Sequence, residues 1–469
     1  MAAEELCYLS AIDLAEAIRT RKVSPVEVVD AVLDRIDRLN PRLNAYCTIL
    51  HEPAREQAKA AEAALMKQED LGPLHGVPVS IKDLTLTRGV RTTRGSKIYE
   101  HFIPDEDAPV VESLKAAGAI IIGKTNTPEF GWKGVTDNPL FGATRNPWNL
   151  DRTPGGSSGG AGAAVAAGLG PLALGTDGGG SIRIPSSFCG IFGLKPSFGR
   201  VPQYPAGWGE GLSHAGPMTR TVRDAALMLN VMARPDDRDR FSLPADGTDY
   251  LQALDTGIEG LRVAWSVNLG YAVVDPEVEE ITSEAVNAFS ELGCQVEAVD
   301  PGFESPERIF SIFYLAGIAA LLWRAVEEWG PHLDPGLLEV IEEGKKLTAI
   351  DVMEAVFQRQ AFWETVRRFF LRYDLLVTPT VAVPPFALGL NDVEIIAGQE
   401  VSPLIGWIPF TYPFNLTGQP AANVPCGWTA DGLPVGLQIV GRRYADVTVL
   451  RAAAAFESVR PWADKWPAL

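Results

Sequence analysis

Two glycine-rich segments that contain serine constrain this chain more than any other feature. Residues 155–160 read Gly-Gly-Ser-Ser-Gly-Gly, and residues 175–185 read Gly-Thr-Asp-Gly-Gly-Gly-Ser-Ile-Arg-Ile-Pro. Glycine lets a substrate approach the backbone closely and leaves N–H groups that can point at a developing oxyanion. An isolated lysine, Lys82, follows a short apolar run upstream. Together these residues offer a nucleophile, a relay and a base without any histidine.

The pattern around these segments predicts an α/β core. Short apolar runs at residues 77–81, 120–122 and 172–174 are bounded by glycine and proline, which is typical of buried strands. Residues 108–118 lie between them and predict a helix that ends at its glycine. Residues 159–170 are almost all Ala and Gly, and we interpret them as a tightly packed central helix rather than a flexible linker. Strands that alternate with helices favour the α/β class.

Helices are predicted on both sides of this core. Residues 10–66 look helical throughout, and Ser24-Pro25-Val26-Glu27 has the spacing of a capping box with proline at the first helical position. Residues 276–292 predict one amphipathic helix, and residues 305–373 a helical block. Residues 374–380 then predict a strand that ends in a loop.

Residues 401–430 carry no charge but contain five prolines, which forbids a long helix. We interpret this stretch as a buried loop system beside a pocket. No repeat or clear linker divides the chain. We therefore expect one domain over residues 1–469, with four parts: an N-terminal helical segment (1–66), a catalytic core (74–225), a helical insertion on the substrate side (305–373) and the C-terminal part of the core (374–469).

Composition excludes several classes of function. The 469 residues carry a formal charge of -18, which argues against nucleic acid or an anionic membrane as a partner. The five cysteines show no CxxC spacing and the five histidines no HxxxH pattern, so we expect no metal and a reducing, cytoplasmic location. The N-terminus has no apolar run typical of a signal peptide. The longest apolar run, residues 309–323, is too short to span a membrane and predicts a buried helix, with a membrane-facing patch as the minor alternative.

The serine segments allow more than one chemistry. Residues 155–159 match the G-x-S-x-G nucleophile elbow of α/β-hydrolases, with Ser157 at its centre and Ser158 there after a shift of one residue. That elbow requires a strand directly before it, whereas residues 149–154 look like a loop, and neither His214 nor His332 has the context of a catalytic base. A phosphate-binding loop is not favoured either, because the glycines are not followed by the Lys-Ser/Thr pair that such a loop requires. Tight structural turns would explain the glycines but not the two serines and the lysine beside them.

The chain resembles the amidase-signature hydrolases. Both serine segments, Gly-Gly-Ser-Ser-Gly-Gly and Gly-Thr-Asp-x-Gly-Gly-Ser-Ile-Arg-x-Pro, look like the core signature of that family. The resemblance covers most of the chain and includes further motifs at residues 74–78, 123–126, 138–139, 415–421 and 432–438. One departure is Leu84, where many members carry Asn after Lys-Asp; it concerns loop packing more than chemistry.

The resemblance implies a single α/β domain with a mixed, twisted sheet enclosed by helices, and a site that needs no cofactor. It implies Ser181 as the nucleophile, Ser157 as a serine joined by a cis peptide, and Lys82 as the base. The amides of Gly178, Gly179, Gly180 and Ser181 would form the oxyanion hole. Lys82 can serve only if burial keeps it neutral; the alternative is an ion pair with Asp83 or a surface position. We expect Asp177 and Arg183 to fix the loop through hydrogen bonds.

The implied activity is hydrolysis of a small-molecule carboxylic amide, and also of esters or carbamates, through an acyl-enzyme on Ser181. A homodimer is left open. The alternative within the family is the A subunit of the tRNA-dependent glutamine amidotransferase, which works in a complex. Those subunits typically continue Gly-Arg-Val with Ser-Arg-Phe-Gly, whereas residues 199–204 read Gly-Arg-Val-Pro-Gln-Tyr. This favours a free-standing amidase. The intact serines and lysine argue against a non-catalytic binding protein.

Aromatic residues predict an apolar substrate pocket. Trp132 lies at the positions that line the acyl pocket in similar enzymes, and Gly131 beside it could offer a backbone carbonyl. Other aromatic side chains fall in the uncharged stretch and in the apolar helix: Trp407, Phe410, Tyr412, Phe414, Phe310 and Phe313. Each alone is equally well explained as a core residue, but together they favour an apolar pocket. We expect medium-length aliphatic or aryl amides to outperform small or charged ones.

Overall fold

The computed structural model describes residues 2–69, 71–207, 209 and 211–469. The strands are β1 Tyr46–Ile49, β2 Pro78–Lys82, β3 Ile120–Thr125, β4 Leu172–Asp177, β5 Phe192–Lys195, β6 His214–Thr219, β7 Arg262–Trp265, β8 Gln295–Ala298, β9 Leu375–Pro379, β10 Ile395–Ile396, β11 Gln399–Glu400, β12 Ala421–Trp428 and β13 Pro434–Gly441. The helices are α1 Ala3–Leu6, α2 Ala11–Arg19, α3 Pro25–Leu43, α4 His51–Met66, α5 Pro109–Ala116, α6 Gly159–Ala166, α7 Arg183–Cys189, α8 Val222–Met232, α9 Tyr250–Ala253, α10 Pro276–Ala285, α11 Asn287–Glu291, α12 Glu307–Leu322, α13 Val326–Trp329, α14 Pro335–Gly344, α15 Ala349–Phe369, α16 Pro413–Thr417 and α17 Asp446–Val459.

One mixed sheet organises the described residues into a single α/β domain. Its strand order is β1-β3-β2-β4-β6-β5-β12-β13-β9-β7-β8. The strands β3, β2 and β4 are parallel, the middle of the sheet is antiparallel, and β9, β7 and β8 are parallel again. Because neighbouring parallel strands end at the same edge, β2 and β4 bring Lys82 and the loop after Asp177 together at that edge.

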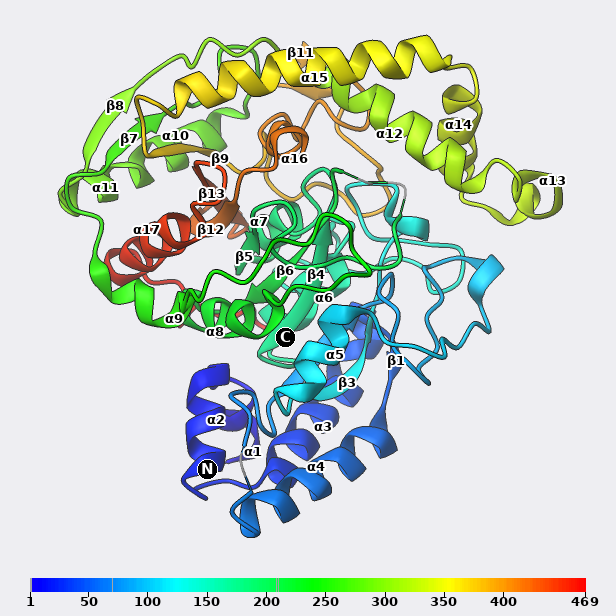
Figure 1. Cartoon of the computed structure of the whole chain (residues 1–469), viewed down its shortest axis with the longest axis vertical. Helices are drawn as coiled ribbons and strands as arrows, with labels where there is room; N and C mark the ends of the chain where they lie inside the picture. Colours follow the sequence, from blue (N-terminus) through cyan, green and yellow to red (C-terminus); the bar gives the residue numbers. More distant parts are fainter. Residues whose placement is uncertain (1, 70, 208, 210) are drawn as a thin grey trace.

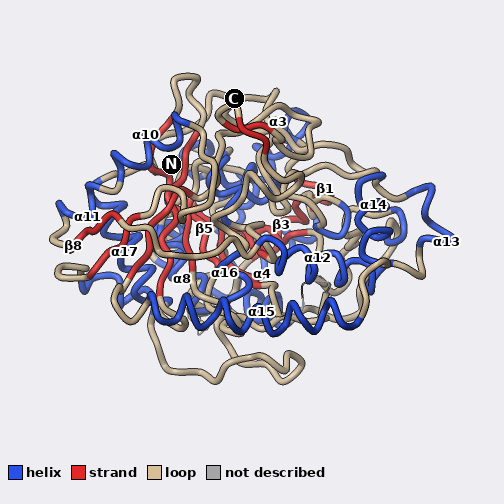
Figure 2. The backbone as a smooth tube through the Cα atoms, turned by 90° about the horizontal axis from the view of Figure 1, so that it is seen from above, coloured by secondary structure: helices blue, strands red, loops and turns tan. Residues whose placement is uncertain are grey.

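Helices surround the sheet. Figure 1 shows α2, α3 and α4 gathered at one end of the molecule and α12, α14 and α15 at the opposite end. Seen from above, the strands run through the middle of the molecule, and α15 lies along one side (Figure 2). The mixed sheet enclosed by helices confirms the fold expected from the resemblance.

The central helix α6 is confirmed. Every residue of α6 is buried, and apart from Val165 all are Gly or Ala. It packs against β4 and α7, because small side chains allow close approach in a dense interior. Helix α6 therefore supports the strand and the helix that flank the second glycine-rich segment.

The expected strands at β2, β3, β4 and β9 are present, as is the capping box of α3. There the Ser24 hydroxyl accepts the Val26 N–H at 3.0 Å, and the Glu27 carboxylate accepts the Ser24 N–H at 2.8 Å. Three details differ from the predictions. Strand β1 interrupts the segment expected to be helical. Helix α3 ends at Leu43, the next residue Asn44 has a φ of +52°, and the chain then pairs with β3. The helix expected over residues 276–292 divides into α10 and α11 at Val286.

The third difference is that the loop system expected over residues 401–430 is wrong in its second half. Residues 421–428 form β12, a strand between β5 and β13 in the centre of the sheet. The prolines misled the prediction because a proline interrupts a strand ladder. Here the register shifts between Pro425 and Gly427, and a bulge of this kind accommodates the missing N–H.

The apolar run at residues 309–323 forms most of α12. No single described helix is long and apolar enough to cross a membrane; α12 reaches the required length and composition only together with Val326–His332, to which it is bent by 79°.

Candidate active site

Lys82 lies at the end of β2 and is fully buried. Its Nζ is 2.7 Å from Ser157 Oγ, 2.9 Å from Ser158 Oγ and 3.1 Å from Thr176 Oγ1. The adjacent Asp83 instead accepts the Thr93 N–H at 3.0 Å and lies 3.9 Å from Lys124 Nζ. The alternatives of a surface position or an ion pair with Asp83 are therefore excluded for Lys82.

Burial favours the neutral form of the Lys82 amine. Removal of the ammonium from water lowers the pKa of Lys82 well below its ordinary value, and the more distant Asp177 carboxylate opposes this only in part. A neutral amine keeps a lone pair with which it can accept a proton. The three surrounding hydroxyls can exchange protons with it and bring no compensating charge.

The first glycine-rich segment presents Ser157 to this amine. The peptide bond between Gly156 and Ser157 is cis. Thr136 Oγ1 donates to the Gly155 carbonyl at 2.8 Å and accepts the Gly159 N–H at 3.1 Å, so a single side chain holds both ends of the turn. A Cβ on Gly156 would collide with the Val135 carbonyl, which explains the glycine there.

The second segment is organised by Asp177 and Arg183. The Asp177 carboxylate accepts the N–H groups of Gly180 at 2.8 Å and Ile182 at 3.1 Å, and Arg183 Nε and Nη2 at 3.0 and 2.9 Å. Burial alone would raise the pKa of Asp177, but Arg183 holds this pKa well below its usual range. The structural role expected for both residues is confirmed.

The loop leaves backbone donors beside Ser181. The Gly180 N–H is taken by Asp177, so it is committed to holding the loop. In residues 2–69, 71–207, 209 and 211–469, nothing accepts a hydrogen bond from the N–H of Gly178, Gly179 or Ser181. The Ser181 carbonyl accepts the Ser158 N–H at 3.2 Å, which ties the two serine segments together.

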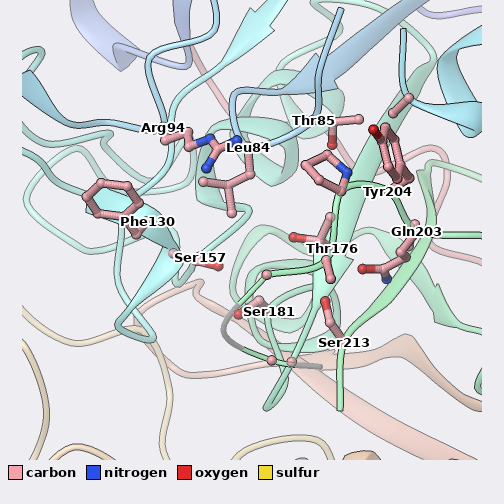
Figure 3. A pocket seen from close by; sticks show the side chains of 18 of the residues that line it. Leu84, Thr85, Arg94, Phe130, Ser157, Thr176, Ser181, Gln203, Tyr204 and Ser213 are labelled. Atoms are coloured by element: carbon pink, nitrogen blue, oxygen red, sulfur yellow. The ribbon is translucent and has the colours of Figure 1, made fainter. Parts of the chain in front are cut away.

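Two cavities meet at Gly131 and Ser181. The Ser157 cavity, shown in Figure 3, is lined among others by Leu84, Thr85, Arg94, Phe130, Gly131, Ser157, Thr176, Gly178, Ser181, Gln203, Tyr204 and Ser213. The Trp132 cavity is lined by Gly131, Trp132, Lys133, Gly134, Gly179, Ser181, Ile184, Phe310, Tyr314, Leu404, Ile405 and Ile408. Ser157 lines only the first of the two.

Two of the aromatic residues singled out from the sequence, Trp132 and Phe310, line the Trp132 cavity. Tyr314 also lines it, and its hydroxyl donates to the Trp132 carbonyl at 2.6 Å. The sequence analysis missed Tyr314, although it lies four residues after Phe310 and therefore on the same helix face.

The other aromatic residues are not part of the described lining of either cavity: Phe313, Trp407, Phe410, Tyr412 and Phe414. Trp407 stacks on Phe188 with ring centroids 5.8 Å apart, and Tyr412 stacks behind Phe310 at 5.0 Å. Trp407, Phe410, Tyr412 and Phe414 are buried core residues, and Phe313 is partly buried against the same core. Leu404, Ile405 and Ile408 line the Trp132 cavity instead.

The geometry does not match an α/β-hydrolase. Residues 146–154 form turns and two isolated bridges, and no strand leads into the serine. His214 is buried in β6, where burial and the neighbouring Lys195 lower its pKa well below the ordinary value. Within the described parts of the chain, no group of three or more His, Cys, Asp and Glu side chains could hold a metal ion.

Known proteins share this arrangement along the whole chain. The family described as Amidase matches residues 27–450. The chain belongs to the amidase family. An acylamidase from Rhodococcus erythropolis is 46% identical, over 100% of this chain and 99% of its own length. The structure of a bacterial aryl acylamidase of the amidase-signature enzymes superposes with a TM-score of 0.92 at 35% identity, over 97% of both chains.

A second kind of relative is the A subunit of glutamyl-tRNA(Gln) amidotransferase. The sequence from Carboxydothermus hydrogenoformans is 38% identical to this amidase, over 97% of both proteins. The amidase is thus similar to hydrolases and to one component of an amidotransferase, with higher identity to the acylamidase. Its reaction is the hydrolysis of C–N bonds in carboxylic amides.

Proposed function

We propose that this amidase is a free-standing enzyme that forms an acyl-enzyme on Ser181, with Ser157 as proton relay and Lys82 as base. The observation that carries the proposal is the buried Lys82 amine, 2.7 Å from Ser157 Oγ and surrounded by hydroxyls. A serine hydroxyl is a weak nucleophile at neutral pH and requires a base within hydrogen-bond reach.

The steps follow from this arrangement. Lys82 takes the proton of Ser157, Ser157 takes that of Ser181, and Ser181 Oγ bonds to the substrate carbonyl carbon. The resulting oxyanion accepts the N–H groups of Gly178, Gly179 and Ser181. As the C–N bond breaks, Ser157 returns a proton to the leaving nitrogen. Water then attacks the acyl-enzyme by the same route and releases the acid.

The two cavities divide the substrate. The residue that protonates the leaving nitrogen is Ser157, and it lines only the Ser157 cavity. The amine therefore leaves through that cavity, and the acyl group occupies the Trp132 cavity. There, Trp132, Phe310 and Ile408 offer an apolar surface. Gly131 lines both cavities, and we assign its carbonyl as the acceptor of a hydrogen bond from the substrate.

An apolar acyl cavity sets the order of substrates. Each additional buried methylene contributes about 0.8 kcal/mol, so kcat/KM rises about tenfold or more from acetamide to hexanamide. The comparison uses acetamide, hexanamide, benzamide and glutamine, together with a hexanoate aryl ester and an aryl carbamate. Glutamine or acetamide as the best substrate contradicts the apolar acyl cavity. Glutaminase activity that depends on added partner subunits favours the amidotransferase alternative.

The proposed triad is tested with Ser181→Ala, Ser157→Ala and the control His332→Ala. Ser181→Ala loses turnover and labelling by a fluorophosphonate probe, Ser157→Ala loses most of both, and His332→Ala keeps them. Loss of turnover in a folded His332 or His214 variant would revive the α/β-hydrolase hypothesis. We further propose a cytoplasmic location for the enzyme, in keeping with its five free cysteines.

A further inference from the structure

Among the described residues that line the Ser157 cavity, Arg94 alone carries a charged side chain. In Figure 3 its guanidinium lies beside Leu84. The Trp132 cavity also has a cation in its wall, Lys133, but that charge is balanced. Lys133 Nζ is 2.7 Å from Asp137 and 3.0 Å from Asp334. The two cavities thus differ in their unbalanced charge.

Arg94 has no anionic partner of its own. In the described parts of the chain, no side chain or carbonyl accepts a hydrogen bond from its guanidinium, and Nε is buried without a partner. Its contact is with the face of the Tyr99 ring, 4.7 Å from the ring centroid. A guanidinium carries five N–H donors, and buried donors without acceptors are costly. The guanidinium is therefore available to donate hydrogen bonds to an acceptor on a bound ligand.

The backbone fixes the direction of this side chain. Arg94 has a φ of +55°, in the left-handed region that non-glycine residues seldom adopt. Its N–H donates to the Asp83 carbonyl at 3.1 Å, and its own carbonyl accepts the Phe130 N–H at 2.8 Å. These bonds connect Arg94 to the end of β2 on one side and to the Phe130–Gly131 wall on the other. A constrained backbone of this kind is typical of a functional site.

We propose that Arg94 binds an anionic group on the amine half of the substrate. The preferred substrates then combine an apolar acyl group with an amine that carries a carboxylate, as in N-acyl amino acids and N-acyl aminobenzoates. A guanidinium binds a carboxylate through two parallel hydrogen bonds, which sets orientation as well as affinity. The assignment to the amine half rests on the proposed function, in which Ser157 protonates the leaving nitrogen within the same cavity.

The test compares two amides with the same acyl group. N-hexanoyl-4-aminobenzoate carries a carboxylate where N-hexanoyl-4-methylaniline carries a methyl group. We expect the wild type to favour the anionic amide in kcat/KM, mainly through a lower KM. Arg94→Met lowers this preference at least tenfold, and Arg94→Lys retains part of it because one ammonium replaces the paired donors.

Arg91→Met is the matched control. Arg91 lies on the same loop, but its Nη2 is bound to the Cys47 carbonyl at 3.3 Å and to Thr48 Oγ1 at 3.4 Å, outside the cavity lining. We expect Arg91→Met to keep the wild-type preference. An equal fall in both variants would reflect net charge alone and overturn the proposal for Arg94.

Other outcomes are equally decisive. A preference that is unchanged in Arg94→Met overturns the role of Arg94 and leaves the proposed triad intact. Failure of the wild type to hydrolyse either amide, with Ser181 unlabelled, overturns the proposed function itself. If Arg94→Met does not fold, product inhibition of the wild type decides: 4-aminobenzoate should inhibit about tenfold more strongly than 4-methylaniline, and equal inhibition constants contradict an anion site.

Discussion

Two buried lysines on neighbouring strands of the amidase have opposite surroundings. Lys82 ends β2, and Lys124 lies on β3, where it is the register partner of Ile81. Both side chains are fully buried. Lys124 donates to the Thr85 carbonyl at 2.6 Å and to Thr92 Oγ1 at 2.8 Å, and it lies 3.9 Å from the Asp83 carboxylate. Lys82 is surrounded by hydroxyls, and no described carboxylate lies within 4.0 Å of it.

These surroundings affect the pKa values of the two amines differently. Burial lowers the pKa of Lys124 to about 8, while Asp83 opposes the fall, so Lys124 is mainly charged at neutral pH. Burial also lowers the pKa of Lys82 well below its ordinary value, without a carboxylate in contact to oppose it. Burial alone therefore does not make a base. A buried lysine can act as a base where no carboxylate lies beside its amine. Where a carboxylate does lie beside it, the lysine stays protonated and serves as a structural cation.

The largest contrast is expected from replacing each lysine by methionine. Lys82→Met removes the proposed base and should lower kcat/KM by about 10³-fold or more, in a protein that still folds. Lys124→Met leaves Asp83 buried without its cation and should cost about 3–5 kcal/mol of unfolding free energy. Steady-state kinetics and chemical denaturation of both variants measure the two effects. Full activity of Lys82→Met would remove the base from the mechanism.

The pH dependence of turnover separates the two lysines next. Because the base must be neutral, kcat/KM should fall as pH drops through the lowered pKa of Lys82 and reach a plateau at neutral to alkaline pH. The fall should keep its midpoint in Lys124→Met and disappear in the residual activity of Lys82→Met. A wild-type rate that rises toward acid pH is incompatible with a neutral lysine base.

Stability should respond to pH over different ranges. A lysine whose pKa is lowered by folding is protonated in the unfolded chain first, so stability rises with pH between the folded and unfolded pKa values. For Lys124 this range runs from about 8 to the unfolded value, and below about pH 8 the difference between wild type and Lys124→Met should change only through Asp83, whose pKa Lys124 lowers.

For Lys82 the range extends from its own lowered pKa to the unfolded value, and within it the difference between wild type and Lys82→Met should change by at most about 1.4 kcal/mol per pH unit. Denaturation curves of the wild type and the two methionine variants at several pH values measure it. If stability changes with pH in the same way in both variants, the hydroxyls around Lys82 and the carboxylate of Asp83 have the same effect on the pKa of the neighbouring lysine. That result would contradict the comparison.

The smallest effect is expected from single hydroxyls. Thr176→Val removes the acceptor 3.1 Å from Lys82 Nζ, and Thr92→Val removes the one 2.8 Å from Lys124 Nζ. Loss of one hydrogen bond to the ammonium form lowers a pKa by less than about one unit. The acid limb of kcat/KM should therefore move to slightly lower pH in Thr176→Val and stay in place in Thr92→Val. If the acid limb moved only in Thr92→Val, Lys124 rather than Lys82 would be the base.

Local features were predictable because their signals are local. The strand at β2, the capping box at Ser24 and the Ala-Gly helix α6 each depend on neighbouring residues. The proximity of Lys82 to Ser157, 75 residues apart, came only from the resemblance to a family, since nothing in the spacing requires it. The strand β12 was missed because burial on both faces removes the alternation of apolar and polar residues by which a half-exposed strand is recognised.

The cavity walls could not be predicted from the sequence. Arg94 stands between Thr93 and Gly95 and forms no recognisable motif. Its lack of an acceptor can be found only when the positions of all its neighbours are known. The aromatic residues of the 407–414 stretch were equally ambiguous, because core packing and cavity lining favour the same side chains. Figure 3 shows how residues from several parts of the chain share one wall.

The anchors of Arg183 also determine when the enzyme becomes competent during its synthesis. Arg183 donates to the Thr411 carbonyl at 2.9 Å, and to Asn415 Oδ1 and Gln438 Oε1 at 2.7 Å each, residues more than two hundred positions later. When the ribosome has just added Ser181 to the chain, none of these three acceptors has yet been synthesised. We therefore expect the loop that carries Ser181 to reach its final conformation only after β13 has been synthesised. A nascent or C-terminally truncated chain should not hydrolyse amides, even though it already contains Lys82, Ser157 and Ser181.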